Sequence, residues 1–163
     1  MAENFFTERR RVFNWPVEYE DILLMLQGKN MKGENTHAPM VVTNAHAVII
    51  AASLGILHNR TKDVGKSKLA IPIETFDSQK FGNTELSSYI GLIFLLSDSK
   101  NPDKNLKKLR ESESDEDSNE LHMIHVVEKY AAGGLEYLRG SLTDKGDSTG
   151  ELVLETEVLR LYA

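Results

Sequence analysis

VVTNAHAVIIAASLG, residues Val41–Gly55, is the stretch that decides the fold. Thr43 or Asn44 can cap a helix at its start, and Gly55 is placed to close that helix. Four apolar side chains between them recur at helical spacing on one face: Ala47, Ile50, Ala51 and Leu54. We therefore predict an amphipathic helix here and expect further helices to pack against its apolar face.

Four other segments carry helix signals. They are Trp15–Gly28, Thr84–Leu96, Asn101–Arg110 and Asn119–Arg139. The first has Pro16 in its opening turn and glycine past its end, and the second starts with a threonine as a candidate cap. The last is the longest and carries acidic residues near its start, which complement the helix dipole. These segments predict a mainly α fold, a compact bundle of about five helices.

Three segments are expected to lie outside the helices. Residues 1–14 are polar and arginine-rich, and we expect a flexible arm there. Leu69–Ile73 is expected to be a short extended segment, which Pro72 limits to a sheet edge or a turn. The acidic run Glu111–Asn119 is expected to be a mobile loop because its carboxylates repel one another. Residues 1–163 together are the size of a single domain.

The composition excludes several classes of protein. The chain has no cysteine, which excludes disulfide scaffolds, thiol nucleophiles and iron–sulfur ligation. Its longest apolar runs are far shorter than the roughly 20 residues of a membrane span, and its start lacks the apolar core of a signal peptide. We therefore expect a cytoplasmic protein that does not contact a membrane.

The charge is distributed unevenly along the chain. The net charge is −6, yet residues 1–70 carry nine Lys and Arg against seven Asp and Glu. Residues 71–163 carry ten Lys and Arg against eighteen Asp and Glu. An acidic total disfavours a broad phosphate-binding surface, although local basic faces could still contact DNA.

Two basic clusters are the candidates for contact with double-stranded DNA. One is a polar loop with Arg60, Lys62, Lys66 and Lys68, and the other is a short helix with Lys104, Lys107, Lys108 and Arg110. Both could bind phosphates if folding gathers them onto one face. The competing interpretation is ordinary solvated surface charge.

A histidine-containing helix face is the candidate for metal chemistry. His122, His125 and Glu128 follow one another at i+3 spacing, so all three could point to a similar side of one helix. The alternative is a polar face that packs or contacts a partner. His46 is expected on the polar side of its helix, and no nucleophile elbow or phosphate-binding glycine loop is present. No catalytic residue and no cofactor is therefore predicted.

The pair Gly133-Gly134 is an unusual feature of the longest predicted helix. Two glycines inside a helix cost about 1 kcal/mol each relative to alanine, so a compensating contact is expected. One interpretation is close backbone approach by another helix or by a partner, and the other is a kink or helix end before Tyr137. In the first case Gly133, Gly134 and Tyr137 could form a partner interface, including one between two copies of the chain.

Three segments in this order resemble a known family: Val41–Gly55, Ala70–Asp98 (AIPIETFDSQKFGNTELSSYIGLIFLLSD) and Glu128–Gly140 (EKYAAGGLEYLRG). They resemble the small accessory proteins associated with bacterial Dnd-type DNA phosphorothioation systems. More distantly, they are similar to the E protein of the Dnd modification complex, which associates with DNA and with the sulfur-transfer machinery. The resemblance implies partners among the proteins of a DNA modification or restriction complex.

The leading functional hypothesis is a non-enzymatic adaptor in a phosphorothioation-linked anti-phage defence system. It would act through protein contacts and through possible contacts with DNA. The first alternative is a direct DNA-binding module that uses the two basic clusters. The second is a metal-dependent nuclease or hydrolase that uses the histidine-containing face.

Overall fold

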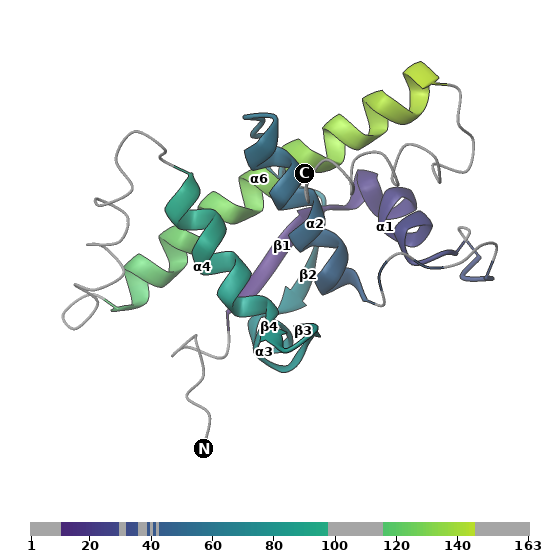
Figure 1. The fold of residues 1–163 in the computed structure, drawn as a ribbon. Coiled ribbons are helices and arrows are strands. Elements are labelled where there is room, and N and C mark those ends of the chain that lie inside the picture. Colours follow the sequence, from purple (N-terminus) through teal and green to yellow (C-terminus); the bar gives the residue numbers. More distant parts are fainter. Residues whose placement is uncertain are drawn as a thin grey trace.

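The computed structural model describes residues 11–29, 32–35, 39, 41, 43–97 and 116–145. This part of the chain is mainly helical, as predicted, with two small antiparallel sheets (Figure 1). Its elements are β1 (Val12–Pro16), a 3₁₀ helix (Val17–Tyr19), α1 (Glu20–Leu26), α2 (Asn44–Leu57), β2 (Lys68–Pro72), α3 (Ile73–Ser78), β3 (Lys80–Phe81), β4 (Thr84–Glu85), α4 (Leu86–Leu96) and α6 (Glu116–Lys145). None of these helices is both long and apolar enough to cross a membrane.

Helix α2 is central to the core and packs against α6, α4 and α1. Thr43 caps it as predicted, because its side-chain oxygen accepts a hydrogen bond from the backbone N–H of His46. The helix continues to Leu57, so Gly55 does not close it. Figure 1 shows α6 running across the molecule, with α2 and α4 packed on it.

The stretch Val12–Pro16 is a strand, where the sequence suggested a flexible arm followed by a helix start. Phe13 and Trp15 alternate along β1 and both are buried, which is the period of a strand packed on a core. β1 pairs antiparallel with β2, and Trp15 lies opposite Leu69. The prediction of an arm is therefore wrong for residues 12–14, while residues 1–10 lie outside the described part.

The first predicted helix consequently starts later than expected. A 3₁₀ turn follows Pro16, and α1 begins at Glu20. Its end agrees with the sequence, because Gly28 has a φ of 74°, a left-handed conformation that glycine adopts without strain. The N–H of Gly28 donates to the carbonyl of Met25 and completes the helix end.

The extended segment predicted near Leu69–Ile73 is confirmed as β2, which ends at Pro72. Two elements after it were not predicted. Helix α3 follows directly and buries Ile73 and Phe76. The β3–β4 hairpin then turns through Gly82, which has a φ of 60°. These elements are only a few residues long, too short to show periodicity in the sequence.

The two later helices are confirmed, but with different bounds. Thr84 lies in β4 and does not cap α4, which begins at Leu86 without a side-chain cap. Helix α6 begins at Glu116, so the prediction of a loop is wrong for residues 116–119. The prediction of a basic helix at residues 101–110, the first part of the acidic run at 111–115, and residues 146–163 lie outside the described residues.

Candidate functional site

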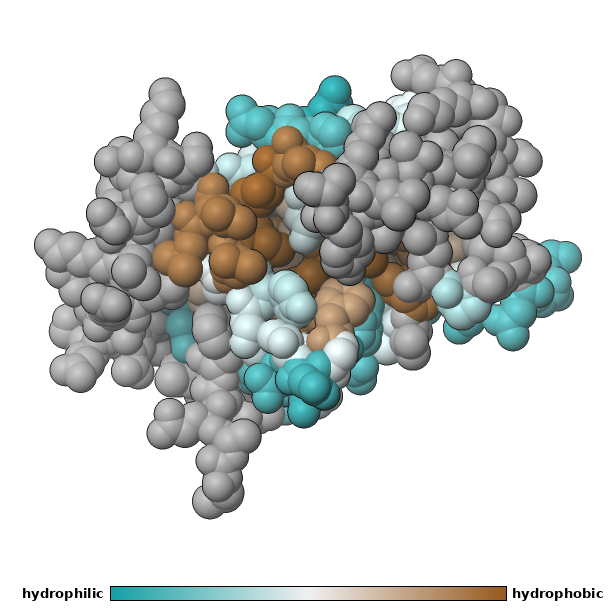
Figure 2. Space-filling model, viewed as in Figure 1, coloured by the Kyte–Doolittle hydropathy of each residue, from teal (hydrophilic) through white to brown (hydrophobic). Residues whose placement is uncertain are grey.

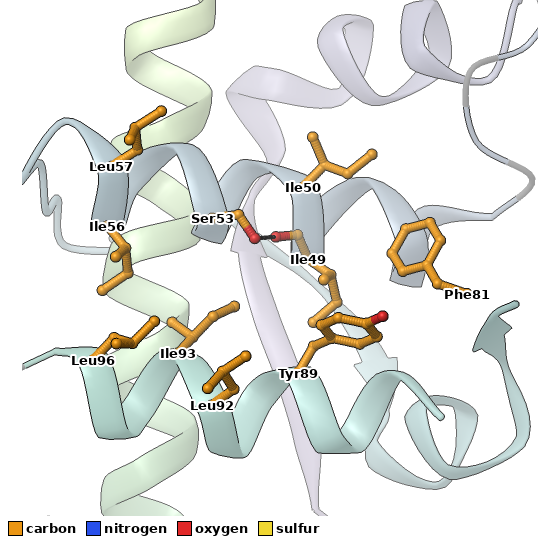
Figure 3. Close-up of a pocket in the computed structure, with 10 residues that line it drawn as sticks. All are labelled: Ile49, Ile50, Ser53, Ile56, Leu57, Phe81, Tyr89, Leu92, Ile93 and Leu96. Atoms are coloured by element: carbon orange, nitrogen blue, oxygen red, sulfur yellow. Dashed lines mark hydrogen bonds between the residues drawn. The ribbon is translucent and has the colours of Figure 1, made fainter. Parts of the chain in front are cut away.

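An apolar groove between α2 and α4 is the candidate functional site (Figure 3). It has a volume of about 380 Å³. Ten side chains line it, nine of them apolar or aromatic: Ile49, Ile50, Ser53, Ile56, Leu57, Phe81, Tyr89, Leu92, Ile93 and Leu96. A concave apolar surface without a charged side chain suits the apolar side chains of a ligand or a protein segment.

Helical periodicity on two elements builds the walls of the groove. α4 contributes Tyr89, Leu92, Ile93 and Leu96, which recur at i, i+3, i+4 and i+7. On α2, the one polar side chain of the groove is satisfied within its own helix, because the Ser53 hydroxyl donates to the carbonyl of Ile49 at 2.9 Å. Figure 3 shows Ile49 and Ile56 of α2 pointing toward the side chains of α4 across the groove.

The groove leaves large apolar side chains open to solvent. Leu57 is 48% exposed, Leu92 50% and Leu96 51%. Figure 2 shows the apolar residues of this face as a continuous brown patch. Contiguous apolar patches of this kind mark interaction surfaces, since they cost free energy while they stay in water.

A buried histidine positions one end of the groove. His46 is 6% exposed, and its two ring nitrogens lie 2.8 Å from the Thr43 hydroxyl and 2.8 Å from the carbonyl of Lys80. Its ring meets Phe81 edge-on with centroids 4.7 Å apart, and Phe81 meets Tyr89 in the same way at 5.7 Å. His46 is therefore a core residue that fixes the β3–β4 hairpin against α2, and its expected place on a polar face is wrong.

One comparison with known proteins gives a match. The model of the DNA sulphur modification system-associated protein 4 family matches residues 18–160. The chain belongs to this family. The match covers most of the chain and confirms the resemblance carried by the three sequence segments, while no curated protein and no solved structure matches.

In this member of the DNA sulphur modification system-associated family, Gly133 and Gly134 lie within the uninterrupted helix α6. A Cβ on Gly134 would lie 2.6 Å from the carbonyl carbon of Ala51, and one on Gly133 would lie 2.8 Å from the backbone nitrogen of Thr61. A Cβ on Gly55 would likewise lie 2.9 Å from the carbonyl carbon of Tyr130. Close approach by another helix is the correct interpretation, and the helix has no kink.

These close backbone contacts remove Gly133 and Gly134 from any partner interface. Both are buried by α2 and by the loop that follows it. Tyr137 is half-buried, and His58 stacks on its ring at a centroid distance of 3.8 Å. The Arg60 guanidinium lies 5.4 Å from the ring centroid. Gly133 and Gly134 therefore belong to an internal contact of α6 with α2 and the loop after it, while a partner contact of Tyr137 stays a prediction.

Lys62 of the basic loop is held by side chains of the chain itself. The Lys62 ammonium donates to the hydroxyl of Tyr19 at 2.7 Å and pairs with Glu18 at 3.0 Å and Glu136 at 3.2 Å. The hydrogen bond to Tyr19 is the main cause that raises the pKa of Lys62 above its ordinary value. Lys62 therefore ties the loop to α6 and is already neutralised by two carboxylates.

The other predicted basic residues of this loop are exposed. The Arg60 guanidinium lies over the Tyr137 ring, Lys66 lies in the loop, and Lys68 is the first residue of β2. The second predicted cluster, which consists of Lys104, Lys107, Lys108 and Arg110, lies outside the described residues.

The histidine-containing face is split between core and solvent. The Glu128 side chain is buried, and its Oε2 accepts a hydrogen bond from the backbone N–H of Asn14 in β1 at 2.5 Å. His125 is exposed, with its Nε2 4.0 Å from Oε1 of Glu128, and the His122 ring meets Phe94 edge-on. Burial is the main cause that raises the pKa of Glu128 above its ordinary value.

These residues do not converge as ligands. Within the described ranges, no three His, Cys, Asp or Glu side chains lie close enough to hold a metal ion. His122, His125 and Glu128 therefore do not form a ligand set within the described part of the chain. Glu128 instead links α6 to the β1 strand.

The groove was missed by sequence reasoning, although a signal for it was present. α2 and α4 carry apolar residues on more than one face, and only one face of each can be covered by α6. An all-round apolar helix in a small domain is either fully surrounded or leaves an apolar surface. The sequence alone does not tell which of the two holds.

Proposed function

We propose that the chain is a non-enzymatic accessory protein of a bacterial DNA sulphur modification system linked to phage defence. In this proposal it acts as an adaptor that binds another protein of the system through the groove between α2 and α4. The observation that carries the proposal is the groove itself, which leaves three leucines half-exposed. Membership of the family supplies the context for the partner.

The geometry favours an amphipathic helix of the partner as the occupant. Tyr89 to Leu96 are eight residues of α4, and about 10 Å of helix separates the first from the last. A partner helix could therefore insert apolar side chains from two successive turns, at i, i+3 or i+4 and i+7. A small apolar pocket acts as a hot spot, because a few buried anchors supply most of the binding energy.

Leu92→Glu in the full-length chain tests the proposal. Leu92 is 50% exposed, so the variant is expected to fold, while a carboxylate in the groove opposes binding of an apolar segment. The matched control is Leu69→Glu, because Leu69 is 38% exposed and lies on β2, outside the groove. Both variants are co-expressed with each of the other proteins of the host's DNA sulphur modification system, and capture is measured after nuclease treatment.

We expect the wild type and Leu69→Glu to capture the same protein of the system, and Leu92→Glu to lose at least about tenfold in capture. Equal capture by both variants would exclude the groove as the docking surface. Capture that disappears with nuclease would favour the DNA-binding alternative, which a steep salt dependence of DNA binding would then support.

A further inference from the structure

An apolar segment follows α6 in the sequence. Residues 151–162 read ELVLETEVLRLY, and seven of these twelve are apolar: Leu152, Val153, Leu154, Val158, Leu159, Leu161 and Tyr162. A segment with so many aliphatic side chains gains free energy by burying them. The described residues end at Lys145, and the family match extends to residue 160, so the family domain includes both the groove and most of this segment.

We propose that residues 151–162 occupy the α2–α4 groove in the isolated chain and that the partner protein displaces them. The occupancy stands on the groove and the segment, while the displacement rests on the proposed function. The groove is lined by neutral side chains alone, which suits the aliphatic side chains of the segment.

The distances allow this occupancy. α2 crosses α6 at Gly134, eleven residues before Lys145, which corresponds to about 16 Å of helix. The five-residue spacer GDSTG, residues 146–150, spans up to about 17 Å when extended. The spacer can therefore return the chain to the level of the crossing, and the twelve residues after it span up to about 40 Å when extended.

The size of the groove favours this segment over a second copy of the chain. Ten residues line the groove, whereas a standard interface between two proteins uses roughly 20–30 residues on each side. The groove alone would therefore hold a second copy only weakly, and a partner protein that binds tightly has to add contacts outside the groove. The segment needs no such additional contacts, because a short linker gives it an effective concentration in the millimolar range.

Covering the groove has a consequence for partner binding. A partner that needs the open groove binds more weakly by the fraction of molecules in which the groove is open. If about nine in ten molecules are covered, the apparent affinity falls about tenfold. Loosening the segment should restore that affinity.

Crosslinking of the full-length chain tests the occupancy directly. The chain has no cysteine, so two introduced cysteines are its only thiols. The test variant is Leu92→Cys with Leu159→Cys, the matched control is Leu69→Cys with Leu159→Cys, and Leu92→Cys alone reports contact between two copies. Each is treated with a short bis-maleimide and separated on a denaturing gel.

We expect a fast intramolecular crosslink in the test variant and at least about tenfold less in the control. Equal crosslinking in both would overturn the proposal, and so would a crosslinked dimer formed by Leu92→Cys alone, since that places a second copy on the groove.

A second measurement tests the displacement. Val158→Asp with Leu161→Asp should loosen the segment and raise partner affinity about tenfold, while Ser148→Asp with Thr149→Asp adds the same charge to the spacer and should leave affinity unchanged. If the first variant binds no tighter than wild type, displacement is excluded. If no form binds any protein of the system, the proposed function fails, and crosslinking still decides the occupancy.

Discussion

The close crossing of α2 and α6 makes a sharp prediction for Gly134→Ala. Gly134 faces the backbone of Ala51, and a new Cβ would lie 2.6 Å from its carbonyl carbon and 3.1 Å from its Cα. Carbon atoms in good contact lie about 3.5 Å apart or more, so the two helices would have to separate by roughly 1 Å. Both groups are backbone, so no change of rotamer relieves the overlap.

Two opposing effects set the change in the free energy of unfolding. Alanine gains about 1 kcal/mol over glycine in a helix interior. Overpacking a close-packed interface costs typically 1–3 kcal/mol, and we expect the upper end or more because the contact is backbone against backbone. The net expectation is a loss of roughly 2 kcal/mol in the free energy of unfolding, which corresponds to a fall in melting temperature of about 4–8 °C for a chain of this length.

Gly140→Ala is the matched control on the same helix. Gly140 is exposed in α6, and a Cβ there would meet nothing within 4 Å. This variant should gain about 0.5–1 kcal/mol through helix propensity alone. Urea unfolding followed by circular dichroism measures both variants. If Gly134→Ala is stabilised as much as Gly140→Ala, the close crossing of the helices is refuted.

Three further predictions concern a cap, a buried carboxyl and an ion-pair network. Thr43→Ala should lower the free energy of unfolding by about 1 kcal/mol in urea unfolding, and Thr84→Ala by less than about 0.5 kcal/mol, since only Thr43 caps a helix; equal losses would contradict this assignment. Because burial raises the pKa of Glu128 in the folded state, the wild type should lose stability relative to Glu128→Gln as the pH rises above 4.5. Urea unfolding from pH 4.5 to about 7 measures that difference, and a difference independent of pH would count against the burial. Lys62→Met should cost roughly 1 kcal/mol in low salt and less in high salt, and a loss that salt does not reduce would argue against the ion pairs.

The long helices were predictable because their periodicity extends over several turns. Most of Val41–Gly55, the later part of Thr84–Leu96 and all of Asn119–Arg139 lie in helices of the structure. Their ends were less predictable, since caps and close contacts set them: Gly55 looks like a helix end in the sequence, but it allows α6 to approach. β1 was missed because Trp15-Pro16 suits a helix start, while the strand depends on pairing with β2, far along the chain.

The candidate site was harder to predict, since it depends on contacts between distant residues. Lys62 belongs to a polar basic loop in the sequence, but the carboxylates that neutralise it come from Glu18 and Glu136. His122, His125 and Glu128 share the spacing of metal ligands, but Glu128 is turned into the core by its hydrogen bond to Asn14. Charge and spacing identified these residues as candidates, but they did not predict which side chains each residue contacts in the fold.

The close contact between α2 and α6 at Gly134 and the groove between α2 and α4 both follow from the composition of α2. Small residues on one face of α2 let α6 approach until backbone meets backbone, as Ala51 and Gly134 show. Between α2 and α4 the side chains are large instead. Leu57 and Leu92 line the groove there and stay half-exposed. A helix that is apolar all round therefore packs tightly on one side and leaves an apolar surface on the other. That surface costs free energy while it stays in water, so it favours an occupant, from the chain itself or from a partner.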